Sequence, residues 1–174
     1  MSGCTLCPRM CGADREHGEV GFCGMPAEIY AARAALHFWE EPPISGEKGS
    51  GAVFFSGCSL GCGFCQNTEI SQEKFGKAIS TQRLREIFGE LMDQGAHYIY
   101  LVTPTHFLPQ ILPALEPKLP VPVVYNCGGY ERVETLRLWE GSVDIYLPDL
   151  KYFSPVLSEK YSGAADYFEA ASRA

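Results

Sequence analysis

Residues 51–67 read GAVFFSGCSLGCGFCQN, an apolar run followed directly by a group of cysteines. The run at 52–55 is typical of a strand that is buried on both faces of a parallel sheet. The loop after it carries Cys58, Cys62 and Cys65 at the spacing C-x3-C-x2-C. In parallel sheets, ligands bind beyond the carboxyl ends of the strands. This stretch therefore predicts a metal site at the end of the first strand of an α/β fold.

Strand and helix patterns alternate through the rest of the chain. The helix pattern at 80–94 is the clearest, because apolar residues recur every three or four positions and Gly95 follows as a helix stop. Alternating strands and helices imply βαβ units, a parallel sheet and right-handed crossovers. The other expected elements are strands at 98–102, 121–125 and 143–147, and helices at 105–115 and 133–139.

The first fifty residues differ from the rest and end in a connector rich in Pro, Gly and Ser. We expect a Cys-rich N-terminal extension and connector at 1–50, with residues 29–39 extended rather than helical, and the α/β portion at 51–174. A sheet of only four parallel strands would leave unpaired backbone groups at an open edge. Residues 51–174 are therefore expected to be the N-terminal portion of a larger (βα) protein. The alternative is a complete four-stranded α/β domain.

The composition excludes several function classes. The chain has 14 Lys and Arg against 21 Asp and Glu, a formal net charge of -7, which disfavours nucleic-acid and anionic-membrane partners. The N-terminus has no apolar signal-peptide core, and the uncharged stretch 96–115 contains three prolines, which argues against a membrane span. The predicted location is the cytoplasm. In that reducing compartment, clustered thiols are more often metal ligands than disulfides.

The cysteines after the first strand, Cys58, Cys62 and Cys65, are called the loop cysteines below. Three thiolates in one tight loop suit an iron–sulfur cube, because soft thiolate is the preferred ligand of such clusters. Three ligands for four irons leave one iron open for a substrate or cofactor. The competing interpretation is a zinc site completed by Cys127 or a histidine.

A second group, Cys4, Cys7, Cys11 and Cys23, is called the N-terminal cysteines below. Its spacing, C-x2-C-x3-C-x11-C, places four thiols within twenty residues and predicts a closed tetrathiolate site. A structural zinc ion would stabilise a segment with little core of its own, and an auxiliary [4Fe-4S] cluster is the rival. The remaining alternative is a set of thiols without metal.

The loop sequence SGCSLGCGFCQN resembles the cluster loop of radical S-adenosylmethionine (SAM) enzymes, including the aromatic Phe64 before the last cysteine. The wider chain is similar to the PflX-type branch of pyruvate formate-lyase activating enzyme-like proteins. That likeness is carried by LCPRMCG, EEPPISGEKGSG, VTPTHFLP and VDIYLPDLKYF, and runs from Cys4 to about Tyr167. Members of this branch are considerably longer than this chain, and their core is a (βα) radical SAM barrel. The resemblance implies a partial barrel here.

The resemblance also implies cofactors and the residues that bind them. The loop cysteines would hold a [4Fe-4S] cluster whose fourth iron is chelated by SAM, and Phe64 would lie beside the adenine. Lys151 would pair with the SAM carboxylate, and Asp149 would help to bind a monovalent cation near it. Asn126 is a further candidate for cofactor contact, because an Asn after a strand end presents both a donor and an acceptor. No catalytic residue beyond the cluster and SAM is implied.

Two departures from the family pattern concern the substrate. Val102-Thr-Pro-Thr-His106 replaces the usual G-G-E-P, so recognition of the SAM amino group falls to Thr103, Thr105 or His106, and Tyr125 stands where an Asp is usual. The resemblance implies an oxidoreductase that cleaves SAM to a 5′-deoxyadenosyl radical for hydrogen abstraction. Its electron donor would be flavodoxin- or ferredoxin-like, and its target a glycyl radical enzyme. The alternative is a non-catalytic iron–sulfur or zinc module for electron transfer or structure.

Overall fold

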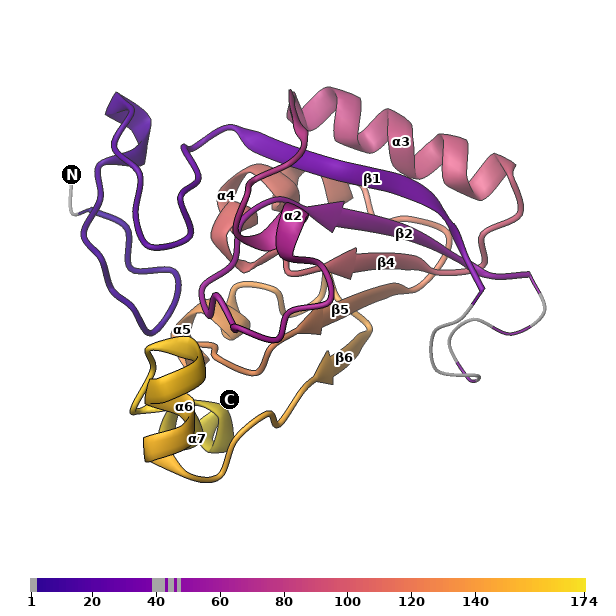
Figure 1. Cartoon of the computed structure of the whole chain (residues 1–174). Coiled ribbons are helices and arrows are strands. Elements are labelled where there is room, and N and C mark those ends of the chain that lie inside the picture. Colours follow the sequence, from indigo (N-terminus) through magenta and orange to yellow (C-terminus); the bar gives the residue numbers. More distant parts are fainter. Residues whose placement is uncertain (1–2, 39–42, 44–45, 47) are drawn as a thin grey trace.

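The computed structural model describes residues 3–38, 43, 46 and 48–174; Trp39 and most of the connector after it lie outside the described residues. Six strands form one mixed sheet in the order β3-β1-β2-β4-β5-β6 (Figure 1). The strands are β1 (Ile29–His37), β2 (Ser50–Phe55), β3 (Lys77–Ile79), β4 (Ile99–Val102), β5 (Val123–Cys127) and β6 (Ile145–Pro148).

The central strands β2, β4, β5 and β6 pair in parallel and in chain order, which confirms the four predicted parallel strands. Both faces of β2, β4 and β5 are largely buried, whereas the residues of β6, at the edge of the sheet, are partly or fully exposed. Val53 and Leu101 pack with α3 (Thr81–Asp93) in the main core, whereas their neighbours Ala52 and Tyr100 form a smaller apolar cluster on the other face. Burial on two sides explains why these strands are continuous apolar runs rather than alternating patterns.

The strands β1 and β3 extend the sheet beyond β2 in the antiparallel sense. Ala34 and Ala35 of β1 stand opposite Val53 and Ala52 of β2, and β3 pairs with the start of β1. The extended structure expected at 29–39 is confirmed over Ile29–His37. The sheet has two strands more than the four parallel strands expected, because β1 and β3 are added beside β2, and β6 forms the other edge.

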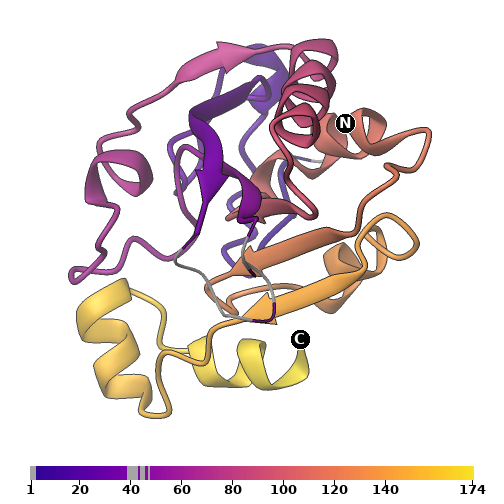
Figure 2. The ribbon, with the colours of Figure 1, turned by 90° about the vertical axis from the view of Figure 1, so that its right-hand side faces the viewer.

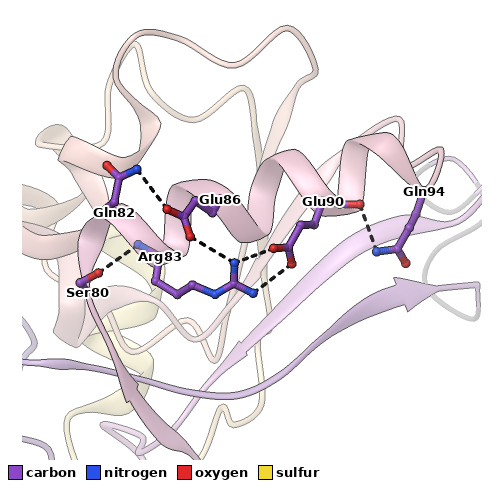
Figure 3. A network of polar contacts seen from close by, with 6 residues as sticks. All are labelled: Ser80, Gln82, Arg83, Glu86, Glu90 and Gln94. Atoms are coloured by element: carbon purple, nitrogen blue, oxygen red, sulfur yellow. Dashed lines mark hydrogen bonds and ion pairs between the residues drawn. The ribbon is translucent and has the colours of Figure 1, made fainter.

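Helix α3 is fixed by its ends and by its buried stripe. The Ser80 side chain accepts the Arg83 N–H at 3.0 Å as an N-cap, and Gly95 follows with φ +100°. On the outer surface, Arg83 bridges Glu86 and Glu90 (Figure 3). Exposed ion pairs of this kind contribute little to stability. The buried stripe of α3 therefore holds it on the sheet, through Leu84, Ile87, Phe88 and Leu91.

The remaining helices are short. The predicted helix at 105–115 is a series of three pieces, because prolines at 109 and 113 interrupt the hydrogen-bond ladder. Helices α6 and α7 lie on the opposite side of the molecule from α3 (Figures 1 and 2). In the described part of the chain, no helix combines the length and apolar character that a membrane crossing requires. The short helices are η1 (Arg15–His17), α2 (Thr68–Ser71), η2 (Thr105–Phe107), α4 (Leu108–Ile111), η3 (Leu112–Leu115), α5 (Val133–Arg137), α6 (Pro155–Ser162) and α7 (Tyr167–Arg173).

Candidate metal and cofactor site

The carboxyl ends of the four parallel strands surround a cavity of about 380 Å³. Cavities of roughly 300–1,000 Å³ are usual for small-molecule and cofactor sites. The loop after β2 forms one wall, and residues at the ends of β4, β5 and β6 form the other. The three loop cysteines line this cavity together with Phe64, Asn126, Asp149 and Lys151, the predicted cofactor residues.

Two of the loop cysteines receive hydrogen bonds from residues close by in the sequence. The backbone N–H of Leu60 donates to Cys58 Sγ at 3.4 Å. The hydroxyl of Ser71, at the end of α2, donates to Cys65 Sγ at 3.2 Å. Hydrogen bonds to the sulfurs of a metal-bound cysteine stabilise its negative charge and orient it. The sequence analysis missed Ser71 in this role.

The third loop cysteine is bonded from the far end of the chain. Ser162, the last residue of α6, donates from its hydroxyl to Cys62 Sγ at 3.1 Å. Its oxygen lies 2.6 Å from the Tyr152 hydroxyl. Because the single Ser162 proton is engaged by sulfur, Tyr152 must donate to Ser162, which gives a relay from Tyr152 through Ser162 to Cys62. Residues 62 and 162 are too far apart in the sequence for any local pattern to have indicated this contact.

The environment of the loop cysteines fits a cluster of several irons. Burial raises the pKa of the Cys58 thiol; the N–H groups of Gly61 and Leu60 lower it, and the charges of Cys62 and Cys65 raise it. Three thiolates in one loop repel one another unless a cation binds them, and metal supplies that charge. Cys127, the fourth ligand of the zinc alternative, does not line the cavity. The donor set of three thiolates therefore fits an iron–sulfur cluster.

The predicted cofactor residues form a polar wall opposite the cluster loop. Lys151 Nζ lies 2.5 Å from Asp149 Oδ2, and both side chains are partly exposed to the cavity. Burial lowers the pKa of Lys151, but the hydrogen bond and the charge of Asp149 outweigh it and raise that pKa above its ordinary value. The cavity thus presents a fixed ammonium group. Phe64 is 55% exposed and packs edge-on against Tyr152.

Tyr167 of α7 holds the strand ends together beneath this wall. Its hydroxyl lies 2.8 Å from the Gly128 carbonyl and 2.9 Å from the Asp149 carbonyl, and it accepts the Lys151 N–H at 2.8 Å. A Cβ on Gly129 would lie 2.2 Å from the Asp149 carbonyl oxygen, and the φ of Gly129 is +75°. Only glycine fits there, which explains the Gly-Gly pair after β5.

The three candidates for binding the SAM amino group are separated by the structure. Thr103 lines the cavity with φ +57°, a strained conformation for a β-branched residue that is characteristic of functional sites. Thr105 and His106 are buried outside the cavity wall. The ring of His106 bonds the Ser56 carbonyl through Nε2 at 2.7 Å, and burial lowers its pKa to about 4. His106 is therefore neutral and supports the start of the cluster loop.

A buried polar network lies behind the cavity, and sequence reasoning missed its central residue. Thr105 Oγ1 donates to Glu131 Oε1 at 2.8 Å and lies 2.7 Å from the Tyr125 hydroxyl. Burial raises the pKa of Glu131 to about 7, against the lowering effect of the hydrogen bonds from Thr105, Tyr125 and Cys127. Cys127, the alternative fourth zinc ligand, is itself buried in the main core and outside the cavity wall.

The segment before β1, which carries the N-terminal cysteines, lies at the end of the sheet towards which β2, β4 and β5 point (Figure 1). Cys7 is buried and Cys11 is exposed, and all eight cysteines of the chain are free thiols. Arg9 connects this coil to the cluster loop: its guanidinium donates to the Ser59 carbonyl at 2.9 Å and to the Ser162 carbonyl at 2.7 Å. The sequence analysis did not single out Arg9.

Comparison with known proteins identifies the class of this site. Residues 44–104, which include all three loop cysteines, match the family of 4Fe-4S single cluster domains. The chain thus contains an iron–sulfur cluster-binding domain within a mixed α/β fold. It is also similar to the uncharacterized protein MJ0674 of Methanocaldococcus jannaschii, with 33% identity over 182 residues. That alignment covers 99% of this chain and 52% of the relative, so the chain spans about half the length of the curated relative it matches.

Proposed function

We propose that this chain is the N-terminal part of a radical SAM enzyme. The observation that carries the proposal is the meeting of three hydrogen-bonded thiols and a fixed ammonium group, Lys151, in one cavity at the strand ends. No fourth cysteine lines that cavity among the residues described. A site for electron transfer alone normally has four thiolates, whereas a three-thiolate site keeps one iron open. The four parallel strands would be the first strands of a (βα) barrel.

The cluster, when bound and reduced, supplies the electron that cleaves SAM to methionine and a 5′-deoxyadenosyl radical. The protein residues bind and orient the cofactor. Lys151 is a compact charge suited to the SAM carboxylate, and Asp149 fixes its position. Asn126 and Thr103 line the wall between the strand ends, where they offer polar groups to the amino group and ribose. Phe64 offers an aromatic face to adenine.

The substrate we propose is a polypeptide, as in the activation of a glycyl radical enzyme. The rim beside the cavity carries apolar side chains that are unusually exposed: Leu150 is 66% and Phe153 is 79% accessible. Exposed apolar surface is one of the features of sites that contact another polypeptide. The electron would come from a flavodoxin- or ferredoxin-like donor.

The test is spectroscopic and does not depend on knowing the substrate. Protein reconstituted with iron and sulfide without oxygen is reduced, and its electron paramagnetic resonance spectrum is recorded with and without SAM. We expect SAM to change the spectrum of the wild type and of the Cys127→Ala control, which alters a cysteine outside the cavity wall. A loaded cluster whose spectrum SAM leaves unchanged would refute the catalytic proposal and favour an electron-transfer module.

A further inference from the structure

The N-terminal cysteines are brought together by backbone hydrogen bonds. Cys4 pairs with the segment after Cys11, its N–H donating to the Ala13 carbonyl at 2.9 Å and its carbonyl accepting the Gly12 N–H at 3.0 Å. A turn closed by the bond from the Met10 N–H to the Cys7 carbonyl, 3.0 Å long, lies between them. Three of the four cysteines therefore lie in one short segment whose two ends are joined by backbone hydrogen bonds.

The fourth cysteine, Cys23, lies in a later turn of the same coil. The Gly24 N–H bonds the Gly21 carbonyl at 2.9 Å, which closes a turn around Cys23. Gly21 itself lies against Cys11: a Cβ at this glycine would be 2.4 Å from Cys11 Sγ. The approach of the two segments therefore depends on a glycine two residues before the last cysteine.

No disulfide joins these four thiols to one another or to another cysteine of the chain. Thiolates gathered in one short segment repel one another unless a cation binds them.

The segment has little else to hold it in shape. Between residues 3 and 28, the buried apolar side chains are only Cys7, Ala13 and Met25. Segments this poor in core usually depend on a metal or a disulfide for their fold. The ordered turns around four free thiols therefore indicate a metal centre.

We propose that Cys4, Cys7, Cys11 and Cys23 ligate a second [4Fe-4S] cluster, closed by four thiolates. Four thiolates give every ligated iron of such a cluster a protein ligand, and soft thiolate is the ligand that these clusters prefer. The position of this group beside the cluster loop favours a second redox centre over a structural ion.

The second centre is packed directly against the cluster loop. A Cβ on Gly57, the residue before Cys58, would lie 2.7 Å from the Cys23 carbonyl oxygen. Arg9, between two N-terminal cysteines, donates to the Ser59 carbonyl on the same loop, and its guanidinium stacks 3.8 Å from the centre of the Phe22 ring. The structure thus places the two cysteine groups side by side, the arrangement that two iron–sulfur centres need in order to exchange an electron.

Metal and sulfide analysis of the full chain, purified and reconstituted without oxygen, tests the inference. The wild type and the Cys127→Ala control should contain about eight irons and eight sulfides, whereas the double variant Cys4→Ala/Cys11→Ala and the single variant Cys65→Ala should each retain about four of both. Two of the four N-terminal ligands are removed together because three thiolates can still hold a cluster; Cys11 is exposed and Cys4 is only partly buried, so neither replacement opens the core. The cluster that remains in Cys65→Ala should give a resonance spectrum that SAM does not change, because all its irons have protein ligands.

Two results would overturn the inference. About four irons with one zinc per wild-type chain would make the N-terminal site structural zinc. About four irons without zinc, unchanged in Cys4→Ala/Cys11→Ala, would mean that the N-terminal cysteines bind no metal. The inference is separable from the proposed function: eight irons with no response of the wild-type spectrum to SAM would refute catalysis and leave the second cluster standing.

Discussion

Replacing Ser162 with alanine should lower the reduction potential of the cluster held by the loop cysteines. The Ser162 hydroxyl donates to Cys62 Sγ at 3.1 Å in a buried position, and this bond strengthens as the cluster gains an electron. A net hydrogen bond is worth about 0.5–1.5 kcal/mol. Because about 1.4 kcal/mol corresponds to 59 mV for one electron, the potential should fall by about 20–65 mV.

The assay is a redox titration followed by electron paramagnetic resonance, on protein of equal iron content. Ser172→Ala is the matched control, because the Ser172 hydroxyl bonds only to the Glu169 carbonyl in α7. Tyr152→Phe leaves the Ser162 proton on sulfur but removes the donor behind it, so its shift should have the same sign and be smaller. A potential that is unchanged or higher in Ser162→Ala would refute the assignment of this hydroxyl as a donor to the cluster.

Three further predictions concern the cavity and its support. Lys151→Met should weaken SAM binding about 10–100-fold in calorimetry, the value of a charge-assisted hydrogen bond; unchanged affinity would remove Lys151 from the site. Gly129→Ala should lower the free energy of unfolding, measured in urea, by about 1–3 kcal/mol, because the new Cβ would meet a carbonyl at positive φ. Gly89→Ala in α3, where a Cβ meets nothing, should raise that free energy by about 0.5–1 kcal/mol. Equal effects of the two substitutions would contradict the packing argument. Burial raises the pKa of Glu131 to about 7, so the folded state keeps a proton that the unfolded state loses above pH 4.5. This group alone should therefore lower the free energy of unfolding by about 3 kcal/mol between pH 5 and pH 8. Glu131→Gln should abolish that part of the slope, and identical slopes in the two proteins would contradict it.

The sequence alone predicted those strands and helices whose pattern is contained in neighbouring residues. The strands β2, β4 and β5 are short apolar runs because both of their faces are buried, and α3 has an N-cap and an apolar stripe, so these elements could be predicted. Strand β3 has three residues, of which Lys77 and Ala78 are exposed, and its pairing with β1 depends on contacts distant in sequence. Nothing in the pattern of residues 77–79 distinguishes it from a loop.

The same limit applies to the site. Cysteine spacing indicated candidate metal ligands, and the resemblance to a family indicated Lys151 and Asp149. The structure brings the three loop cysteines, Lys151 and Asp149 to the same cavity. The groups that bond the sulfurs could not be predicted, because Ser162 is a hundred residues from Cys62 and serine is common on helix ends. Arg9 could have been suspected, since a charged residue between metal-ligating cysteines often bonds nearby carbonyls. Glu131 had no signal, because its burial is a tertiary effect.

The contacts of Arg9 also determine the order in which the site is completed as the polypeptide is synthesised. The N-terminal cysteines are all present once residue 23 has been made, whereas Arg9 bonds the carbonyls of Ser162 and Gly163, 153 and 154 residues further along. A ribosome adds roughly 5–20 residues per second, so the N-terminal cysteines are synthesised many seconds before Ser162 and Gly163, the residues that Arg9 bonds. The nascent chain therefore exposes the thiols of both cysteine groups before α6 arrives with the hydroxyl that bonds Cys62 and the carbonyl that Arg9 bonds, and any cluster delivered during translation would precede these contacts.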